Sequence, residues 1–559
     1  MSGDLLRRPV AVPSRHAAAI VGALSDAGTR LVFGMPGGGP NLDVVGAAAQ
    51  AGLRFVLAHG ETAAAIMAAT CADLTGSPGA VVVTRGPGLA SAVNGIAHAA
   101  LDRLPLVVIA DTVPARDRDR ISHQRLDQDA LARPVAKAVV RLGGDDPGRA
   151  ARLAVRLATT RPPGPVVVNV DPHAGPEPGP PEPGAAADAG ADLAPLTGAL
   201  RNARRLAVLL GADAIGHAGA VRDALGGSGV PALHTYRSRG VMPDRSAGAA
   251  GLFTGGTMEW PLLSAADLIV GLGVDPAELI PAAWGYGAPA LLVTEYPAGS
   301  AGYFTGGTEL VGPLQEAIAV LAAHARQAGS GWPDGAGRAA KRAVTGRLLE
   351  AAASAPGSLA PQDVVTTARA HAPDGAVATV DSGAHMLAVM PLWPADEPRR
   401  LLVSSGLATM GFALPAAIGA ALAAPGRPVI AFTGDGGLGM TLMELETAVR
   451  LRLRVVVIVF NDASLSLIKI KQLPEGQGGD EATGYARTSF AAAAAAMGAA
   501  AATADSTSQL AAALTGALGR EGPTLIDARV DPAGYPAILD LTRGESGRAR
   551  DGRHATGPR

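Results

Sequence analysis

Two aspartates that follow neighbouring apolar runs are the residues best placed to do chemistry in this chain. The run Val429–Phe432 leads into a glycine-rich turn containing Asp435, and a helical stretch follows before the run Val455–Phe460 leads to Asp462. Two parallel strands joined by a helix end at the same edge of a sheet, where ligands bind. Magnesium prefers oxygen ligands and commonly joins one or two carboxylates to phosphate oxygens. The pair therefore predicts a site for a magnesium ion and a diphosphate.

The glycines around Asp435 also allow a second interpretation. Gly434, Gly436 and Gly439 satisfy G-x-G-x-x-G, the pattern of a dinucleotide site and hence of an NAD-linked dehydrogenase. In such a site the residue between the first two glycines is usually small and uncharged. A carboxylate beside a diphosphate is repulsive unless a cation lies between them. Asp435 thus favours the metal site, with Asp462 and the Ser464 carbonyl as further ligands; a helix-capping aspartate is the non-functional alternative.

Length and composition exclude several classes of protein. The 559 residues suggest about three or four domains. A hydrophobic content of 48% and a net charge of −2 indicate a globular protein without a basic field for nucleic acid. The single cysteine, Cys71, rules out an intrachain disulfide. Without a signal peptide or an apolar run of roughly 20 residues, we expect a cytoplasmic protein that does not enter a membrane.

Apolar runs alternate with helical patterns along the whole chain. Continuous apolar strands between helices are typical of parallel sheets covered on both faces, so we expect an α/β fold of three consecutive parallel-sheet domains. Proline-rich and glycine-rich stretches separate them, and the second of these leads into a polar helical stretch. The predicted limits are 13–172, a linker at 173–195, 196–325, a linker at 326–358, 359–537, and a tail at 538–559. The other predicted strands are Ala80–Val83, Leu106–Ala110, Leu206–Leu210, Leu268–Gly271, Leu291–Val293 and Ala376–Val380, and a helix is expected over Ala491–Ala496.

The segment from Asp435 to Asp462 resembles the signature of thiamine-diphosphate-dependent enzymes, a GDG followed about a helix and a strand later by two asparagines. The resemblance extends over essentially the whole chain and is closest to the acetolactate synthase-like group. It implies pyrimidine-binding, central and diphosphate-binding domains in that order. Asn461-Asp462 stands for the asparagine pair, so the site carries one more negative charge. Tighter magnesium binding or a compensating cation is expected to follow.

The same resemblance implies which residues hold thiamine diphosphate. Met410 is expected beneath the bent cofactor, and the Ala408 carbonyl is expected to accept from its amino group. His385 corresponds to half of a Gln-His pair at the diphosphate, and Ala384 replaces the glutamine. The implied cofactor-binding residues are Gly383, His385, Ala408, Met410, Gly434, Asp435, Gly436, Gly437, Asp462, Leu465, Ser466 and Leu467.

Glu61 is the catalytic residue that the resemblance implies in the first domain. Its carboxyl group is expected to hydrogen-bond ring nitrogen N1′ of the cofactor and so promote loss of the thiazolium C2 proton. In the family this glutamate meets the magnesium residues across a subunit interface, which implies a homodimer or homotetramer. A solvent-facing helical glutamate is the non-functional alternative.

The substrate side departs from the family. Gly38 and Gly39 are expected to border the reactive carbon, with His123 and Gln124 facing the same space. The family's carboxylate-binding arginine is replaced by Asp275, and Lys471 stands at the position of its acceptor-selecting tryptophan. Lys469 or Lys471 is a candidate replacement clamp, although both also suit a solvated helix face. The stretches Gly211–Gly216 and Thr235–Gly240 are too weak a signal to predict FAD.

These features predict an enzyme that decarboxylates a 2-oxo acid and transfers the acyl unit to an acceptor carbonyl. The resemblance suggests pyruvate as the donor. A decarboxylase that releases the aldehyde, an inactive cofactor-binding subunit and the NAD-linked dehydrogenase remain as alternatives.

Overall fold

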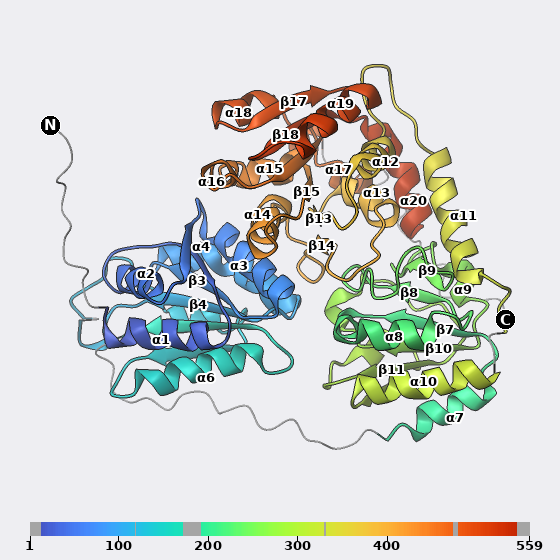
Figure 1. The fold of residues 1–559 in the computed structure, drawn as a ribbon, viewed down its shortest axis with the longest axis horizontal. Helices are drawn as coiled ribbons and strands as arrows, with labels where there is room; N and C mark the ends of the chain where they lie inside the picture. Colours follow the sequence, from blue (N-terminus) through green and yellow to red (C-terminus); the bar gives the residue numbers. More distant parts are fainter. Residues whose placement is uncertain (1–12, 118, 172–191, 329–330, 473–478, 545–559) are drawn as a thin grey trace. The chain divides into compact units, whose positions relative to one another are not determined.

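Three six-stranded sheets, each entirely parallel, form the framework of the protein (Figure 1). The computed structural model describes residues 13–117, 119–171, 192–328, 331–472 and 479–544. The predicted α/β class with three parallel sheets is confirmed. The first sheet lies in one compact unit, and the second and third sheets lie together in another. In the described part of the chain, no helix is both long and apolar enough to cross a membrane.

The first sheet has the order β2-β1-β3-β4-β6-β5. Its apolar strands are buried on both faces, since α1 and α6 cover one face and α3 and α4 cover the other (Figure 1). The strands are β1 (Leu31–Met35), β2 (Arg54–Leu57), β3 (Gly79–Val83), β4 (Leu106–Asp111), β5 (Ala138–Leu142) and β6 (Pro165–Val170). The helices are α1 (Arg15–Asp26), α2 (Pro40–Gln50), α3 (Glu61–Thr75), α4 (Pro87–Leu101), α5 (Gln128–Ala132) and α6 (Pro147–Thr159).

The second sheet has the order β12-β11-β10-β7-β8-β9. Its strands are β7 (Leu206–Leu210), β8 (Ala232–His234), β9 (Ala249–Leu252), β10 (Leu268–Leu272), β11 (Ala290–Thr294) and β12 (Thr308–Val311). Its helices are α7 (Ala194–Asn202), α8 (Ala218–Leu225), α9 (Trp260–Leu263), α10 (Leu314–Ala328) and α11 (Ala336–Glu350).

The third sheet has the order β14-β13-β15-β16-β18-β17. Its strands are β13 (Val377–Val380), β14 (Leu401–Val403), β15 (Val429–Gly434), β16 (Val455–Asn461), β17 (Ala500–Ala504) and β18 (Thr524–Arg529). Its helices are α12 (Pro361–His371), α13 (Ala384–Leu392), α14 (Ala413–Ala423), α15 (Asp435–Thr441), α16 (Glu444–Arg450), α17 (Ser466–Gln472), α18 (Phe490–Ala496), α19 (Thr507–Leu518) and α20 (Tyr535–Arg543).

Three segments differ from the sequence-based expectation. The expected glycine turn is absent because β15 runs to Gly434 and α15 begins at Asp435. The predicted linker at 326–358 contains α11, which packs on β9. The predicted tail begins inside α20, whose Ile538 and Leu539 are buried against the third sheet's core, so the packed structure continues to Arg543. Most of the predicted first linker, residues 172–191, lies outside the described residues.

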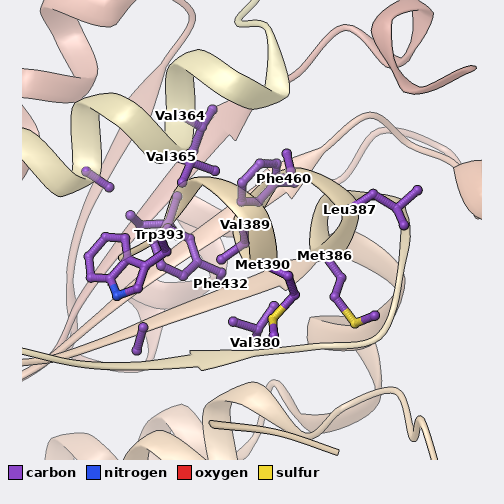
Figure 2. Packing of buried hydrophobic residues seen from close by; sticks show 14 of the residues in the cluster. Val364, Val365, Val380, Met386, Leu387, Val389, Met390, Trp393, Phe432 and Phe460 are labelled. Carbon is purple, nitrogen blue, oxygen red and sulfur yellow. The ribbon is translucent and has the colours of Figure 1, made fainter. Parts of the chain in front are cut away.

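Helix α13 lies between α12 and the third sheet. Its apolar side chains fill the space between the valines of α12 and the aromatic rings of β15 and β16 (Figure 2). Trp393, just after the helix, packs edge-on against Phe432 at a centroid distance of 5.1 Å. The labelled residues are Val364, Val365, Val380, Met386, Leu387, Val389, Met390, Trp393, Phe432 and Phe460. This packing fixes the helix whose first residues reach the carboxyl edge of the sheet.

A buried arginine from the second sheet's domain holds the other end of α13. Arg239 donates hydrogen bonds to the carbonyl oxygens of Met390 and Trp393 and to the carboxylate of Asp244. The Met390 carbonyl lies in the last turn of α13, and the Trp393 carbonyl lies just after it. Carbonyl groups at a helix C-terminus have no hydrogen-bond partners within the helix. Arg239 thus ties the second and third sheets together within their shared unit.

Asp244 completes this charged cluster. It accepts from the backbone N–H of Ala395 at 2.7 Å and from Lys341 Nζ at 2.6 Å, and its side chain is only 3% exposed. Burial alone would raise the pKa of Asp244, but the charges of Arg239 and Lys341 outweigh burial and hold it well below its usual range. The carboxylate is therefore charged at neutral pH, and removing its charge leaves a buried guanidinium uncompensated.

We expect Asp244→Asn to lower the free energy of unfolding by about 3–5 kcal/mol, the usual cost of breaking a buried ion pair. Urea unfolding at pH 7 measures this value. The matched control is Arg245→Gln, which removes an exposed pair with Asp396 and should cost less than about 1 kcal/mol. Equal losses in the two variants would contradict the role given to the buried cluster.

Candidate active site

The first and third sheets present the same kind of crevice at their carboxyl edges. In each, the chain order reverses beside the first strand, between β1 and β3 and between β13 and β15. Ligands bind at such switch points because the loops diverge there. Gly383 and His385 follow β13, and Asp435 follows β15, so the expected diphosphate residues lie at the switch point of the third sheet.

Asp435 and Asp462 lie at this edge on adjacent strands. β15 pairs with β16 in parallel, with Gly434 opposite Phe460. Asp435 accepts hydrogen bonds from the backbone N–H groups of Gly436 at 2.7 Å and Ala463 at 2.6 Å. The second bond joins Asp435 to the residue directly after Asp462. The structure therefore brings the two predicted metal ligands together.

Asp462 is held by its own loop. Its carboxylate accepts from the Ser464 N–H at 3.1 Å and from the Ser466 hydroxyl at 2.6 Å. Ser464 also forms an isolated antiparallel bridge with Gly484, in which the bonds are made by the flanking residues. The Ser464 carbonyl does not take part in that pairing, which suits its predicted use as a ligand.

Both carboxylates are electrostatically strained without a cation. Burial raises the pKa of Asp462 to about 7. The hydrogen bond from Ser466 opposes this increase, whereas the negative charge of Asp435 adds to it. Burial also raises the pKa of Asp435, although backbone N–H groups and the charge of Arg487 oppose it. A divalent cation would relieve both effects. Among the described residues, no group of three or more His, Cys, Asp or Glu side chains could hold a metal. Magnesium commonly takes carbonyl, water and phosphate oxygens beside one or two carboxylates.

Two glycines allow neighbouring side chains to pack closely beside the aspartates. A Cβ atom at Gly436 would lie 2.9 Å from Leu465 Cδ2 and 3.3 Å from Met410 Cε. Met410 thus reaches the first turn of α15, where it is expected beneath the cofactor. A Cβ atom at Gly437 would lie 2.2 Å from a carboxylate oxygen of Asp381. Neither position accepts a side chain without displacing a neighbour.

Asp381, which the sequence did not single out, holds three segments of the site together. It accepts from the Thr433 hydroxyl and from the Phe412 N–H, both at 2.7 Å, and it contacts Gly437. Burial raises its pKa to about 6. The residue connects the strand before Asp435 to the loop that carries Met410. Its position at the end of the predicted strand 376–380 was the only signal in the sequence.

Several buried polar atoms at this edge lack partners, as a ligand site requires. His385 Nε2, Ser382 Oγ and Ser464 Oγ have no hydrogen-bond partner among the described residues. Burial lowers the pKa of His385 to about 4, so its ring is neutral, and it packs on Phe460. Unsatisfied buried groups cost free energy unless a ligand completes them. These unpartnered atoms, together with the carboxylates of Asp435 and Asp462, fit a magnesium-bound diphosphate.

Other predicted residues of this region have different surroundings. Ala408 is exposed and has a φ of +50°, which is strained for a residue with a side chain. Leu467 packs against the core of the third sheet, so its side chain is directed away from the site. Lys469 forms an ion pair with Asp480 at 2.6 Å, whereas Lys471 is exposed. Lys469 and Asp480 line a cavity of about 620 Å³ that Asp462 and Tyr485 also line.

The residues predicted in the first domain gather around the loop between β3 and α4. A Cβ atom at Gly88 would lie 3.3 Å from the Glu61 carboxylate, and one at Gly86 would lie 2.4 Å from the Gln124 carbonyl. Thr84 contacts both Gly88 and Gly37, next to the predicted Gly38 and Gly39. This central loop is not among the site residues predicted from the sequence. The R-G-P-G stretch after the predicted strand 80–83 was the available signal.

Glu61 is half-buried at the first position of α3, and Gly39 precedes α2 with a φ of +59°. Gln124 is also half-buried and has a φ of +56°, while His123 is exposed. Glu61 is the only glutamate among residues 1–170. No other residue of that type in the first domain can take its predicted role.

The second sheet's switch point, between β7 and β10, is filled by the chain itself. A Cβ atom at Gly211 would lie 2.2 Å from the Gly273 carbonyl. Asp275 forms a capping box with Glu278 and accepts from the Tyr296 hydroxyl at 2.9 Å. The residue that replaces the family's arginine therefore has a structural role.

The raised pKa of Asp462 predicts how stability depends on pH. Without metal, the folded protein takes up a proton that the unfolded chain, with a pKa near 3.9, does not hold. Stability therefore falls as pH rises from about 4 to about 7. Asp462→Asn should stabilise the metal-free protein at pH 8 by up to about 4 kcal/mol and have little effect at pH 4. Urea unfolding in EDTA measures both values; a pH-independent effect would contradict this interpretation.

Comparison with known proteins agrees with this geometry. Residues 15–131 match the N-terminal TPP binding domain of thiamine pyrophosphate enzymes, and residues 381–528 match their C-terminal TPP binding domain. The structure is similar to a thiamine diphosphate-dependent 4-hydroxybenzoylformate decarboxylase of Rhodococcus jostii, with a TM-score of 0.77 and 22% identity over 92% of this chain and 99% of that one. This likeness shows a common fold.

Curated relatives extend the match over nearly the full length. The acetolactate synthase of Bacillus subtilis is 30% identical over 553 residues, covering 93% of this chain and 94% of the relative. The catabolic acetolactate synthase of Raoultella terrigena is 30% identical over 540 residues, covering 93% and 96%. These matches decide between the two interpretations of the glycines around Asp435 and exclude the nicotinamide one. The chain belongs to the acetolactate synthase family of thiamine-diphosphate-dependent enzymes.

Proposed function

We propose that this protein uses thiamine diphosphate and Mg²⁺ to decarboxylate a 2-oxo acid, with pyruvate as the donor, and transfers the acyl unit to an acceptor carbonyl. The observation that carries the proposal is the Asp435–Asp462 pair, whose raised pKa values call for a cation at a glycine-lined edge. The names of the similar relatives support carboligation.

The chain's own residues have separate tasks in this proposal. Asp435, Asp462 and the Ser464 carbonyl would hold the magnesium ion, and His385 Nε2 and the Ser464 hydroxyl would donate hydrogen bonds to the diphosphate oxygens. Met410 supports the bend of the cofactor. Thiamine diphosphate, when bound, supplies the electron sink for decarboxylation.

Glu61 controls a proton in this proposal. Its carboxyl group lies beside Gly88 at the carboxyl edge of the first sheet, and it would share a proton with N1′ of the pyrimidine ring. We also propose pyrimidine binding within 13–172, diphosphate binding within 359–537, and a homodimer or homotetramer that brings Glu61 of one subunit to the magnesium residues of another.

A decarboxylase that releases the free aldehyde is the second candidate. Asp275 is committed to a capping box, and Lys469 is paired with Asp480. The position of the family's arginine is therefore acidic, and one of the two candidate lysines is engaged elsewhere. Poor acceptor binding would favour protonation of the intermediate over ligation.

Glu61→Gln should slow exchange of the cofactor's C2 proton by about 10²–10⁴-fold, because the amide cannot share a proton with the ring. Affinity for thiamine diphosphate should change much less. Proton exchange is followed by NMR after rapid quenching. Asp43→Asn removes an exposed carboxylate of the same domain and serves as the control. An unchanged exchange rate in Glu61→Gln would indicate an inactive cofactor-binding subunit.

Incubation with pyruvate, with and without a second 2-oxo acid or an aldehyde, tests ligation directly. We expect mass spectrometry to find carbon–carbon ligated products that need both Mg²⁺ and thiamine diphosphate. Release of free acetaldehyde alone, under all acceptor conditions, would reject the carboligase and leave the decarboxylase.

A further inference from the structure

A polar cavity of about 460 Å³ adjoins Gln124 in the first domain. Its volume lies within the range of small-molecule sites. Three arginines contribute to its walls, namely Arg125, Arg133 and Arg141. The cavity therefore suits a polar ligand. None of the predicted cofactor-binding residues lines it.

Buried amides brace the wall of this cavity. The Gln128 side chain accepts from the Gly86 N–H at 3.1 Å and donates to the Asp111 carbonyl at 3.1 Å and to Asn169 Oδ1 at 2.8 Å. Gln128 is 5% exposed. The adjacent Gln124 is held at a positive φ with its carbonyl against Gly86. Strained backbone of this kind persists where surrounding contacts over-determine it, often at binding sites.

The two acidic groups of the cavity, Asp127 and Asp129, already have hydrogen-bond partners. Asp129 pairs with Arg141 at 2.9 Å and accepts from the Asn169 amide at 2.6 Å. Asp127 caps α5 by accepting from the Ala130 N–H at 2.9 Å. Arg133, by contrast, forms no ion pair with any described residue. The cavity therefore retains positive charge at Arg133, which favours an anionic ligand.

The cavity also lies near the proposed reaction centre. Gly86, which Gln128 and Gln124 contact, begins the turn that brings Gly88 to the Glu61 carboxylate. At the substrate side Lys469 pairs with Asp480, and Asp275 stands where the resemblance implies an arginine. A 2-oxo acid acceptor needs a cation for its carboxylate, and a guanidinium binds carboxylates through two parallel hydrogen bonds.

We propose that Arg133 binds the carboxylate of a 2-oxo acid in this cavity, beside Gln124, and so replaces the missing acceptor clamp. The inference rests on the proposed function for the identity of the ligand. A phosphate group has similar chemistry, so inorganic phosphate is the competing probe.

Arg133→Gln tests this role, with Arg149→Gln as the matched control because Arg149 is exposed on α6 and does not line the cavity. In the enzyme loaded with Mg²⁺ and thiamine diphosphate, Arg133→Gln should raise the pyruvate concentration for half-maximal ligation by about 10- to 100-fold. The decarboxylation kcat should stay within about threefold. Arg133→Lys should give an intermediate shift, and Arg149→Gln should behave like the wild type.

Calorimetric titration of the cofactor-free full chain with pyruvate separates this inference from the proposed function. Binding that Arg133→Gln abolishes supports the site even if the wild type turns over no 2-oxo acid, in which case the proposed function alone fails. The inference is overturned if Arg133→Gln still catalyses ligation with the same half-saturating pyruvate concentration and the same pyruvate binding as the wild type. Saturable binding of phosphate without binding of pyruvate also overturns it.

Discussion

The site at the third sheet depends on two carboxylates that lie together at one edge, where their charges repel each other unless a cation lies nearby. Parallel pairing of β15 and β16 places Asp435 and Asp462 at that edge, and the bond from Ala463 to Asp435 fixes their relation. The raised pKa of each shows that the protein carries an electrostatic cost there in the metal-free state. Such strain is typical of functional sites, where a ligand completes the charge balance. The absence of side chains at Gly436 and Gly437 lets Leu465, Met410 and Asp381 pack closely against this edge.

Support for this edge comes from well outside it. Helix α13 begins at Ala384, next to His385, whose Nε2 has no hydrogen-bond partner among the described residues, and it ends at carbonyl groups that Arg239 holds. The second sheet's domain, whose own switch point is closed by Gly211 and Gly273, thus contributes to the site by fixing the position of a helix. This arrangement agrees with the general rule that precise sites need rigid supporting contacts.

The charges at the substrate side are distributed differently from those that the family resemblance implies. Asp275 caps a turn and binds Tyr296, while Lys469 is neutralised by Asp480. In the first domain the acids near Gln124 are paired, and Arg133 is not. In the proposal, Arg133 binds the acceptor's carboxylate. The cofactor chemistry of the family is then unchanged, but the acceptor is held from a different side. Acceptor choice is therefore the property in which this chain should differ most from its relatives.

The sequence by itself determined the parallel α/β class, most strands and the meeting of Asp435 with Asp462. These follow from local rules, because apolar runs identify buried strands and parallel strands bring the residues after them to one edge. Only the tertiary structure decided the roles of Asp381, Arg239 and Lys469, and the extension of the fold through α20. Asp381 bonds residues 31 and 52 positions away, and Arg239 bonds carbonyls 151 and 154 positions away. Contacts of this range depend on how side chains pack across elements, which leaves no periodic pattern in the chain.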